Sequence, residues 1–209
     1  LYETTYLRDV IERNHLRNPE GMKELVRVIA SGIGSSTNPT RIANTFQSAQ
    51  GVTIKRDTIK QYIDYLKDSF LIEEALRYDV KGRKYIGTET KYYFADIGIR
   101  AAILNYRQQE ETHIMENIIY NELRSRGYNV DVGLVELGGK DKNGKFVRRQ
   151  LEVDFVVNRP PYRFYIQSAF HMPTPEKEQQ ERRPLLSIND HFRKIVIVGD
   201  DIHRKEDEL

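Results

Sequence analysis

Two predicted strands near the end of the chain carry the residues best suited to chemistry. The strands cover residues 151–157 and 164–170, and Pro160 and Pro161 mark a turn between them. Asp154 lies on the first strand, while Gln167 and Ala169 lie on the second. An acidic residue on one strand beside a polar residue on the next could take part in binding a metal ion.

Strand side chains alternate between the two faces of a sheet, which assigns the residues of each strand to a face. Glu152 and Asp154 are expected to share one face of the first strand. Tyr165, Gln167 and Ala169 are expected to share one face of the second. The positions of the first strand expected to point into the core are apolar: Leu151, Val153, Phe155.

The two strands resemble those of PD-(D/E)xK nucleases, with departures at two positions. In that class the first strand supplies an Asp and the second a Glu and a Lys, so that two carboxylates hold Mg²⁺ and the lysine positions the attacking water. Gln167 stands where the Glu is expected, and Ala169 where the Lys is expected. The catalytic lysine is absent, and we expect a vestigial, non-catalytic site.

A further carboxylate of this class often comes from a preceding helix, a position that Glu116 matches. Asp154 and Glu116 are therefore the candidates for weak Mg²⁺ binding. Each has an alternative interpretation. Asp154 would also suit a strand-end carboxylate bonded to the backbone, and Glu116 a solvated helix residue whose charge favours the macrodipole. An active nuclease would need a basic residue from elsewhere to replace the missing lysine.

The composition describes a globular protein without thiol chemistry. The chain has 209 residues, 39% hydrophobic and 31% charged, and the absence of cysteine excludes disulfides, cysteine-based zinc sites and cysteine nucleophiles. No apolar stretch approaches the roughly 20 residues of a membrane span. The net charge of +2 leaves any nucleic-acid contact to a local basic patch. Its histidines show no metal-ligand spacing: His15, His113, His171, His191, His203.

Amphipathic stripes in the first half predict helices followed by a β-hairpin, which is the order of a winged helix. The helices are expected at residues 2–17, 22–29, 38–50 and 57–70. Strands are expected at residues 71–79, 84–86 and 91–94. The basic residues that would contact DNA phosphates lie on two helices and at the tip of the hairpin: Arg41, Lys55, Arg56, Lys60, Lys81, Arg83, Lys84.

DNA contact is one interpretation of these basic residues, and there are two others. Winged helices also serve as protein-binding modules, and isolated basic residues are often merely solvated. Asp57, Asp64 and Asp68 on the same helix as Lys60 argue against DNA. Duplex DNA and a protein partner therefore both remain candidate partners.

A polar linker at residues 105–111 predicts a domain boundary, giving a winged-helix domain at 1–108 and an α/β domain at 109–209. The second half predicts a helix at 113–126, a strand at 128–135, a turn at 138–144, the two strands described above, a helix at 183–189 and a strand at 194–198. This order is typical of a restriction-endonuclease-like mixed-sheet fold. The fold class expected is thus α+β and α/β, a winged helix followed by a nuclease-like domain.

Several phrases, in order along nearly the whole chain, resemble one family. They include TIKQYIDYL at 58–66, KYYFADIG at 91–98, EVDFV at 152–156 and ERRPLL at 181–186, with further matches at 1–9, 42–44, 116–123 and 126–128. The chain resembles the C-terminal half, a domain of unknown function, of prokaryotic AAA+ ATPases. The resemblance implies a preceding ATPase domain that binds ATP and would be a partner of this chain.

No segment of the chain matches the phosphate-binding pattern G-x-x-x-x-G-K-S/T, so we expect no ATP hydrolysis here. The first residue is Leu1, which suggests a fragment. No signal peptide is visible, and a cytoplasmic location without membrane contact is the expectation.

The function expected is that of a non-catalytic binding module with no cofactor of its own beyond weak Mg²⁺. The alternative is an active Mg²⁺-dependent nuclease.

Overall fold

The computed structural model describes residues 7–51, 53–140 and 144–200, which form two compact units. Unit 1 comprises Leu1–Glu74 and Thr88–Asn117. Unit 2 comprises Ala75–Gly87 and Ile118–Leu209. The units are therefore discontinuous, because the tip of the first β-hairpin belongs to unit 2 while its base belongs to unit 1. The boundary expected at residues 108 and 109 assigned the whole hairpin to the first domain.

The helices of unit 1 begin at the polar caps that the sequence offers. The Asn18 side chain accepts a hydrogen bond from the Gly21 amide at 2.9 Å, and Asn38 accepts one from the Arg41 amide at 2.9 Å. Both caps are followed by proline at the first helical position. The helices of the described chain are α1 (Arg8–Arg13), α2 (Pro19–Ser31), α3 (Pro39–Gln50), α4 (Arg56–Asp68), α5 (Ile97–Ile103), α6 (Glu111–Ser125) and α7 (Pro175–Leu186).

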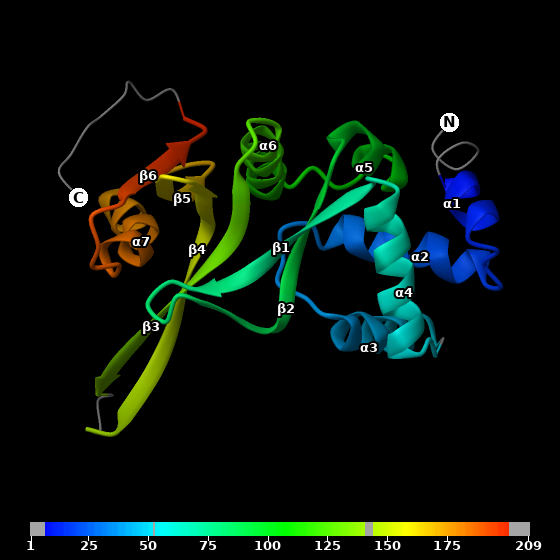
Figure 1. Ribbon diagram of the computed structural model, residues 1–209, viewed down its shortest axis with the longest axis horizontal. Coiled ribbons are helices and arrows are strands. Elements are labelled where there is room, and N and C mark those ends of the chain that lie inside the picture. Colours follow the sequence, from blue (N-terminus) through cyan, green and yellow to red (C-terminus); the bar gives the residue numbers. More distant parts are fainter. Residues whose placement is uncertain (1–6, 52, 141–143, 201–209) are drawn as a thin grey trace. The chain divides into compact units, whose positions relative to one another are not determined.

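The strands form one mixed sheet with the order β2-β1-β3-β4-β5-β6 (Figure 1). They are β1 (Ile72–Asp79), β2 (Lys84–Phe94), β3 (Asn129–Lys140), β4 (Phe146–Arg159), β5 (Tyr162–Ala169) and β6 (Arg193–Val198). β4 runs antiparallel to β3 and β5, whereas β1 pairs with β3 and β5 with β6 in parallel. The predicted succession of helix, three strands, helix and strand in the second half is confirmed.

Several element boundaries differ from the sequence-based prediction. The first helix, expected at 2–17, ends at Arg13, and residues 2–6 lie outside the described part of the chain. Three further differences are larger or concern the site. The last helix begins at Pro175 and ends at Leu186, because the Thr174 hydroxyl caps it by accepting from the Lys177 amide at 3.3 Å. The prediction of 183–189 was therefore wrong. β2 is one strand through a positive-φ glycine, Gly87, where two strands were predicted. β3 continues to Lys140, because residues 138–140, which were predicted as part of a turn, still pair with β4.

A β-bulge in β4 overturns the predicted alternation around Asp154. Asp131 pairs with Val156 and Gly133 with Val153, so two steps along β3 match three steps along β4. The extra residue brings Val153 and Val156 into the same core cluster, beneath α7. Phe155 instead contacts the ring of Tyr120, at 6.5 Å between centroids. Val153 and Phe155 therefore do not share a face.

Gly133 lies opposite this bulge and has no room for a side chain. A Cβ there would lie 2.8 Å from Val156 Cγ2 and 2.9 Å from Val153 Cβ. We expect Gly133→Ala to lower the free energy of unfolding by about 1–3 kcal/mol through overpacking, measured by urea denaturation. Gly139→Ala is the control, because nothing lies within 4 Å of a Cβ at that position. Equal stability of the two variants would contradict the bulge packing.

Candidate functional site

Asp154 lies in the bulge, at the point where the regular pairing of β4 and β5 ends at Phe155 and Ile166. The Asp154 side chain is buried, and its Oδ2 accepts hydrogen bonds from the Ser168 amide at 2.8 Å and the Ser168 hydroxyl at 2.9 Å. The Asp154 amide in turn donates to Gln167 Oε1 at 3.4 Å. Side chains thus replace the backbone ladder where the two strands separate.

Gln167 connects this carboxylate to α7. Its Nε2 donates to Glu181 Oε2 at 3.3 Å, and Glu181 also pairs with the Lys177 ammonium on the same helix. A second carboxylate and a cation therefore lie beside the strand position that lacks an acid. The sequence-based prediction did not identify either group, because it placed the start of the last helix at residue 183. The i, i+4 spacing of Lys177 and Glu181, after a Thr-Pro cap, was the available signal.

Ala169 is buried at the end of β5 and brings no functional group to the site. The described residues contain no group of three His, Asp or Glu side chains able to hold a metal ion. One Asp154 oxygen already accepts from both donors of Ser168, and its neighbour Gln167 offers an amide. This donor set does not fit the two-carboxylate Mg²⁺ site of an active nuclease.

Glu116 belongs to unit 1, whereas Asp154 belongs to unit 2. Glu116 is buried, so the alternative interpretation of this residue as a solvated helix residue was wrong. Its Oε1 accepts from Lys91 Nζ at 2.9 Å and from the Tyr93 hydroxyl at 2.6 Å. Its Oε2 lies 4.0 Å from His113 Nδ1. These contacts, all within unit 1, give Glu116 a structural role in a buried ionic cluster.

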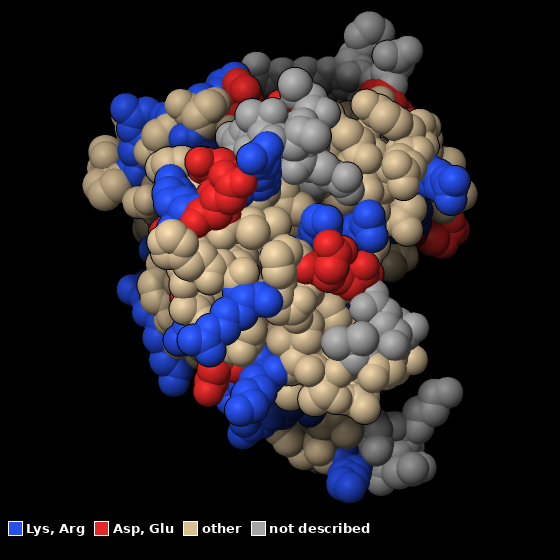
Figure 2. Space-filling model, turned by 90° about the vertical axis from the view of Figure 1, so that its right-hand side faces the viewer, with Lys and Arg blue, Asp and Glu red and all other residues tan. Residues whose placement is uncertain are grey.

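The basic residues predicted to contact DNA divide between the units. Unit 1 carries Lys55, Arg56 and Lys60, which are exposed at the start of α4. Arg41, also in unit 1, is already paired with Glu89 at 3.2 Å. The remaining three come from the hairpin tip in unit 2: Lys81, Arg83, Lys84. The face shown in Figure 2 mixes Lys and Arg with Asp and Glu, so it has no uninterrupted basic surface.

Unit 2 has a second basic element, which the sequence analysis did not predict. Beyond Leu137 of β3 and Leu151 of β4, the paired ends of the two strands extend away from the other elements of unit 2 (Figure 1). We call this ribbon, residues 138–140 and 144–150, the arm. Its exposed basic side chains are Lys145, Arg148 and Arg149. The clustering of basic residues around a glycine-containing turn was the signal for it.

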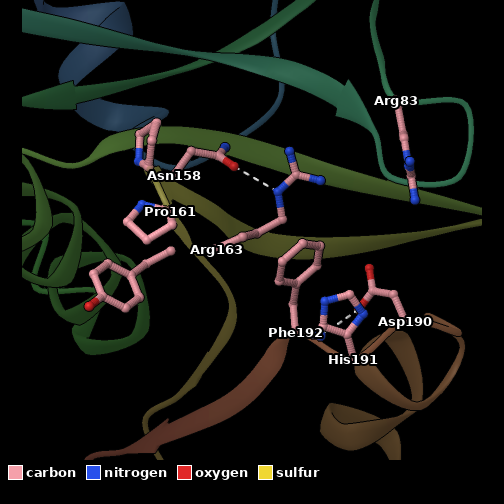
Figure 3. Close-up of a pocket in the computed structure, with 9 residues that line it drawn as sticks. Arg83, Asn158, Pro161, Arg163, Asp190, His191 and Phe192 are labelled. Carbon is pink, nitrogen blue, oxygen red and sulfur yellow. Dashed lines mark hydrogen bonds between the residues drawn. The ribbon is translucent and has the colours of Figure 1, made fainter.

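Unit 2 also contains a pocket of about 500 Å³ beside the turn between β4 and β5. The residues that line it come from the β1–β2 turn, from the β4–β5 turn and from the loop before β6: Arg83, Asn158, Pro160, Pro161, Tyr162, Arg163, Asp190, His191, Phe192. Figure 3 shows the guanidinium groups of Arg83 and Arg163 directed toward the same space, with Phe192 and His191 beneath them. Sequence reasoning assigned only Arg83 among these residues, and assigned it to DNA.

Arg163 is held in place from several directions. Its Nε donates to Asn158 Oδ1 at 2.7 Å, and its guanidinium carbon lies 5.6 Å from the Tyr78 ring centroid and 5.3 Å from that of Phe192. Burial alone would lower the pKa of Arg163, but interactions with Tyr165 and Tyr78 outweigh it and raise the pKa. The side chain is therefore a permanent, oriented positive charge.

Asp190 is the carboxylate that lines this pocket. It accepts hydrogen bonds from the Tyr165 hydroxyl at 2.6 Å and from the Phe192 amide at 3.1 Å. Burial raises the pKa of Tyr165, and the bond to Asp190 raises it further, so the phenol stays a donor at all ordinary pH values. Asp190 thus has a fixed position as an acceptor at one side of the pocket.

Comparison with known proteins finds a family model and relatives in two organisms. The model of a family described as a domain of unknown function (DUF8612) matches residues 1–110. An uncharacterised protein of Haemophilus influenzae is 30% identical over 199 residues, which cover 95% of this chain and 46% of that protein. An uncharacterised protein of Methanocaldococcus jannaschii is 28% identical over 153 residues, which cover 73% of this chain and 31% of that protein.

The chain thus spans less than half the length of either relative. No solved structure matches the chain significantly. None of the helices in the described ranges has both the length and the apolar character needed to cross a bilayer.

Proposed function

We propose that this chain, which belongs to the DUF8612 family, is a nucleic-acid-binding module whose nuclease-like site does not cleave. The observation that carries the second part is the use of Asp154 Oδ2 by both donors of Ser168. A carboxylate oxygen with two close protein donors is poorly placed to hold a cation, and the chain offers an amide where a second acid is needed. In this proposal Asp154 stabilises the sheet by joining β4 to Ser168 of β5.

The binding part rests on basic residues in two places. In unit 1, α2, α3 and α4 precede a hairpin, and Thr37 forms an isolated bridge with Thr90 of β2, which supports a winged-helix arrangement. The start of α4 would then face the duplex with Arg56 and Lys60. In unit 2, the arm offers a two-stranded ribbon, an element that the major groove of B-DNA admits. Both would contact phosphates chiefly through charge.

Within the longer proteins of this family, we propose that the module follows an AAA+ ATPase domain and supplies its binding surface. The resemblance of this chain to the C-terminal halves of such ATPases supports the assignment. The aligned relatives have additional length that leaves room for such a domain. Hydrolysis of ATP would then take place in that domain.

A second candidate function is a Mg²⁺-dependent nuclease whose missing groups come from α7. Glu181 lies within hydrogen-bond distance of Gln167, and Lys177 pairs with Glu181. These two residues would supply an acid and a cation to the end of β5. The lack of a three-ligand group among the described residues favours the non-catalytic proposal.

The test combines DNA binding and cleavage on the same samples. We expect weak binding to a duplex oligonucleotide by fluorescence anisotropy, with log K falling by about 0.9 per phosphate contact for each unit of log salt. The variants Arg56→Ala/Lys60→Ala and Arg148→Ala/Arg149→Ala should each reduce this slope by about 1.8, because each removes two contacts. Plasmid incubated with the protein and Mg²⁺ or Mn²⁺ should stay intact.

Arg8→Ala/Arg27→Ala is the matched control, since both arginines are exposed on α1 and α2, outside the two proposed contact regions. It should leave the slope unchanged. Binding that survives both basic-site variants, or that never appears at low salt, would instead favour a protein partner. Phe70, which is 76% exposed with a positive φ after α4, would be the first residue to examine in that case. Metal-dependent nicking that is lost in Asp154→Ala would overturn the non-catalytic proposal.

A further inference from the structure

We propose that the pocket of unit 2 binds a nucleoside phosphate, with Arg163 and Arg83 holding the phosphate and Asp190 accepting a hydrogen bond from the nucleoside. This inference is separate from the contacts proposed for α4 and the arm. It rests on three properties of the pocket: an oriented cation, a charge without a counterion, and aromatic walls beside a fixed acceptor.

The oriented cation is Arg163. Rings on two sides and the bond to Asn158 fix its plane, so little side-chain entropy remains to be lost on binding. A guanidinium fixed in this way suits the paired acceptor oxygens of a phosphate. Arg163 is half-buried and lines the cavity, so a ligand there can reach the fixed guanidinium.

The charge of the pocket is not neutralised by ion pairs within the described residues. Neither Arg163 nor Arg83 forms a salt bridge with a carboxylate in that part of the chain. Asp190 is engaged by Tyr165 and by the Phe192 amide. Asp131 accepts from Tyr85 at 3.1 Å, and burial raises its pKa, while the Tyr85 bond and the charges of Arg124 and Arg163 lower it. The donors to Asp190 are neutral, so this carboxylate keeps its charge, and two guanidinium groups and one carboxylate line the pocket. The excess of positive charge favours an anion.

The backbone conformation of Arg83 is a further indication that this arginine has a role in the pocket. It has φ 53° in the tight turn between β1 and β2, a conformation that a long side chain adopts rarely. The left-handed backbone at this turn directs its side chain to the pocket, as Figure 3 shows. A glycine or asparagine would fit this turn with less strain, so the turn alone does not account for an arginine.

The size and walls of the pocket favour a nucleoside over a bare anion. A volume of about 500 Å³ exceeds what one phosphate needs and lies within the range of small-molecule sites. Phe192, His191 and Tyr162 provide aromatic surface, and Tyr162 is 61% exposed with one face stacked on Phe164. Bases stack on such surfaces irrespective of sequence. Asp190 can accept from a sugar hydroxyl or an exocyclic amine.

The experiment measures binding of three probes by isothermal titration calorimetry: a purine nucleoside monophosphate, inorganic phosphate and a short single-stranded oligonucleotide. The monophosphate should bind at millimolar or better affinity and more tightly than inorganic phosphate. If the oligonucleotide binds and the monophosphate does not, the nucleoside phosphate belongs to a strand. If the monophosphate binds at least as well, the ligand is a free nucleotide. Either result supports the site, provided that it depends on the two arginines.

Arg163→Gln should weaken binding about 10- to 100-fold, the loss expected for a charge-assisted, bidentate contact. Because this change also removes two ring contacts, Arg83→Asn is the second variant. Asparagine tolerates the same backbone conformation, so this change removes the charge without disturbing the turn. It should weaken binding about 10-fold. Arg183→Gln is the matched control, since Arg183 is exposed on α7 of the same unit and does not line the pocket.

Three results would overturn the proposal. One is the absence of saturable binding of every nucleoside-containing probe. Another is binding that the Arg183 control weakens as much as the two arginine variants do. The third is inorganic phosphate binding as tightly as the nucleotide, which would leave an anion site without nucleoside recognition. Arg56→Ala/Lys60→Ala should retain nucleotide binding, so that failure of the duplex contact and failure of the pocket are distinguishable.

Discussion

Replacing Lys91 with Met should lower the free energy of unfolding by about 3–5 kcal/mol. The side chains of Lys91 and Glu116 are 5% and 6% exposed, and their ion pair spans 2.9 Å. Without the lysine, the Glu116 carboxylate would remain buried with the Tyr93 hydroxyl as a neutral donor. Desolvation of a charge that has lost its opposite charge is the physical reason for the large effect. Urea denaturation followed by circular dichroism measures it.

The double variant Lys91→Met/Glu116→Leu separates the charge from the packing. Because it removes both ions, most of the lost stability should return, as it does for other buried pairs replaced by apolar groups. Lys23→Met is the surface control, since Lys23 forms an exposed pair with Glu20 and its loss should change stability by less than about 1 kcal/mol. A Lys91 variant as stable as this control would show that Glu116 reaches solvent or another cation.

The second large effect is expected at Asp154, where replacement by Ala should cost about 2–3 kcal/mol of folding stability. The change removes the acceptor of the Ser168 amide and hydroxyl in a buried position. An unsatisfied buried amide is costly because water cannot reach it. Asp154→Asn keeps one acceptor oxygen and should lose less. Thermal unfolding in the presence of a chelator gives the comparison without any contribution from metal.

A carboxylate retained for metal binding would behave in the opposite way. Active-site charges are commonly held at a cost in stability, so their removal stabilises the fold. An Asp154→Ala protein that is more stable than the parent in chelator, and that no longer gains stability from added Mg²⁺, would restore Asp154 as a ligand. Loss of stability in chelator instead supports its structural role.

The order of elements was predictable from the sequence because local signals determine it. Apolar periodicity, the Asn18 and Asn38 caps and the turn at Pro160 and Pro161 were sufficient to place most helices and strands. The bulge at Asp154 was not predictable, since the alternation rule assumes that no residue is inserted. One extra residue in β4 changed the faces assigned to Val153 and Phe155.

The partners of the candidate residues depend on the fold rather than on local sequence. Glu116 meets Lys91 across 25 positions, and Gln167 meets Glu181 across 14. The pocket gathers residues from three separate turns and loops, with Arg83 and Arg163 80 positions apart in sequence. Neither spacing nor composition could bring these groups together. The sequence therefore indicated where acids and bases occur but not which of them share an environment.

The arm imposes few constraints on the rest of unit 2. Its residues are largely exposed, and the last core contacts before it are those of Leu137 and Leu151. A ribbon with two solvated faces can gain or lose residues in opposing pairs without changing which side chains enter the core. Its length and charge can therefore diverge between related proteins while the sheet is preserved. Such a ribbon allows the recognition of a partner to evolve separately from the stability of the fold.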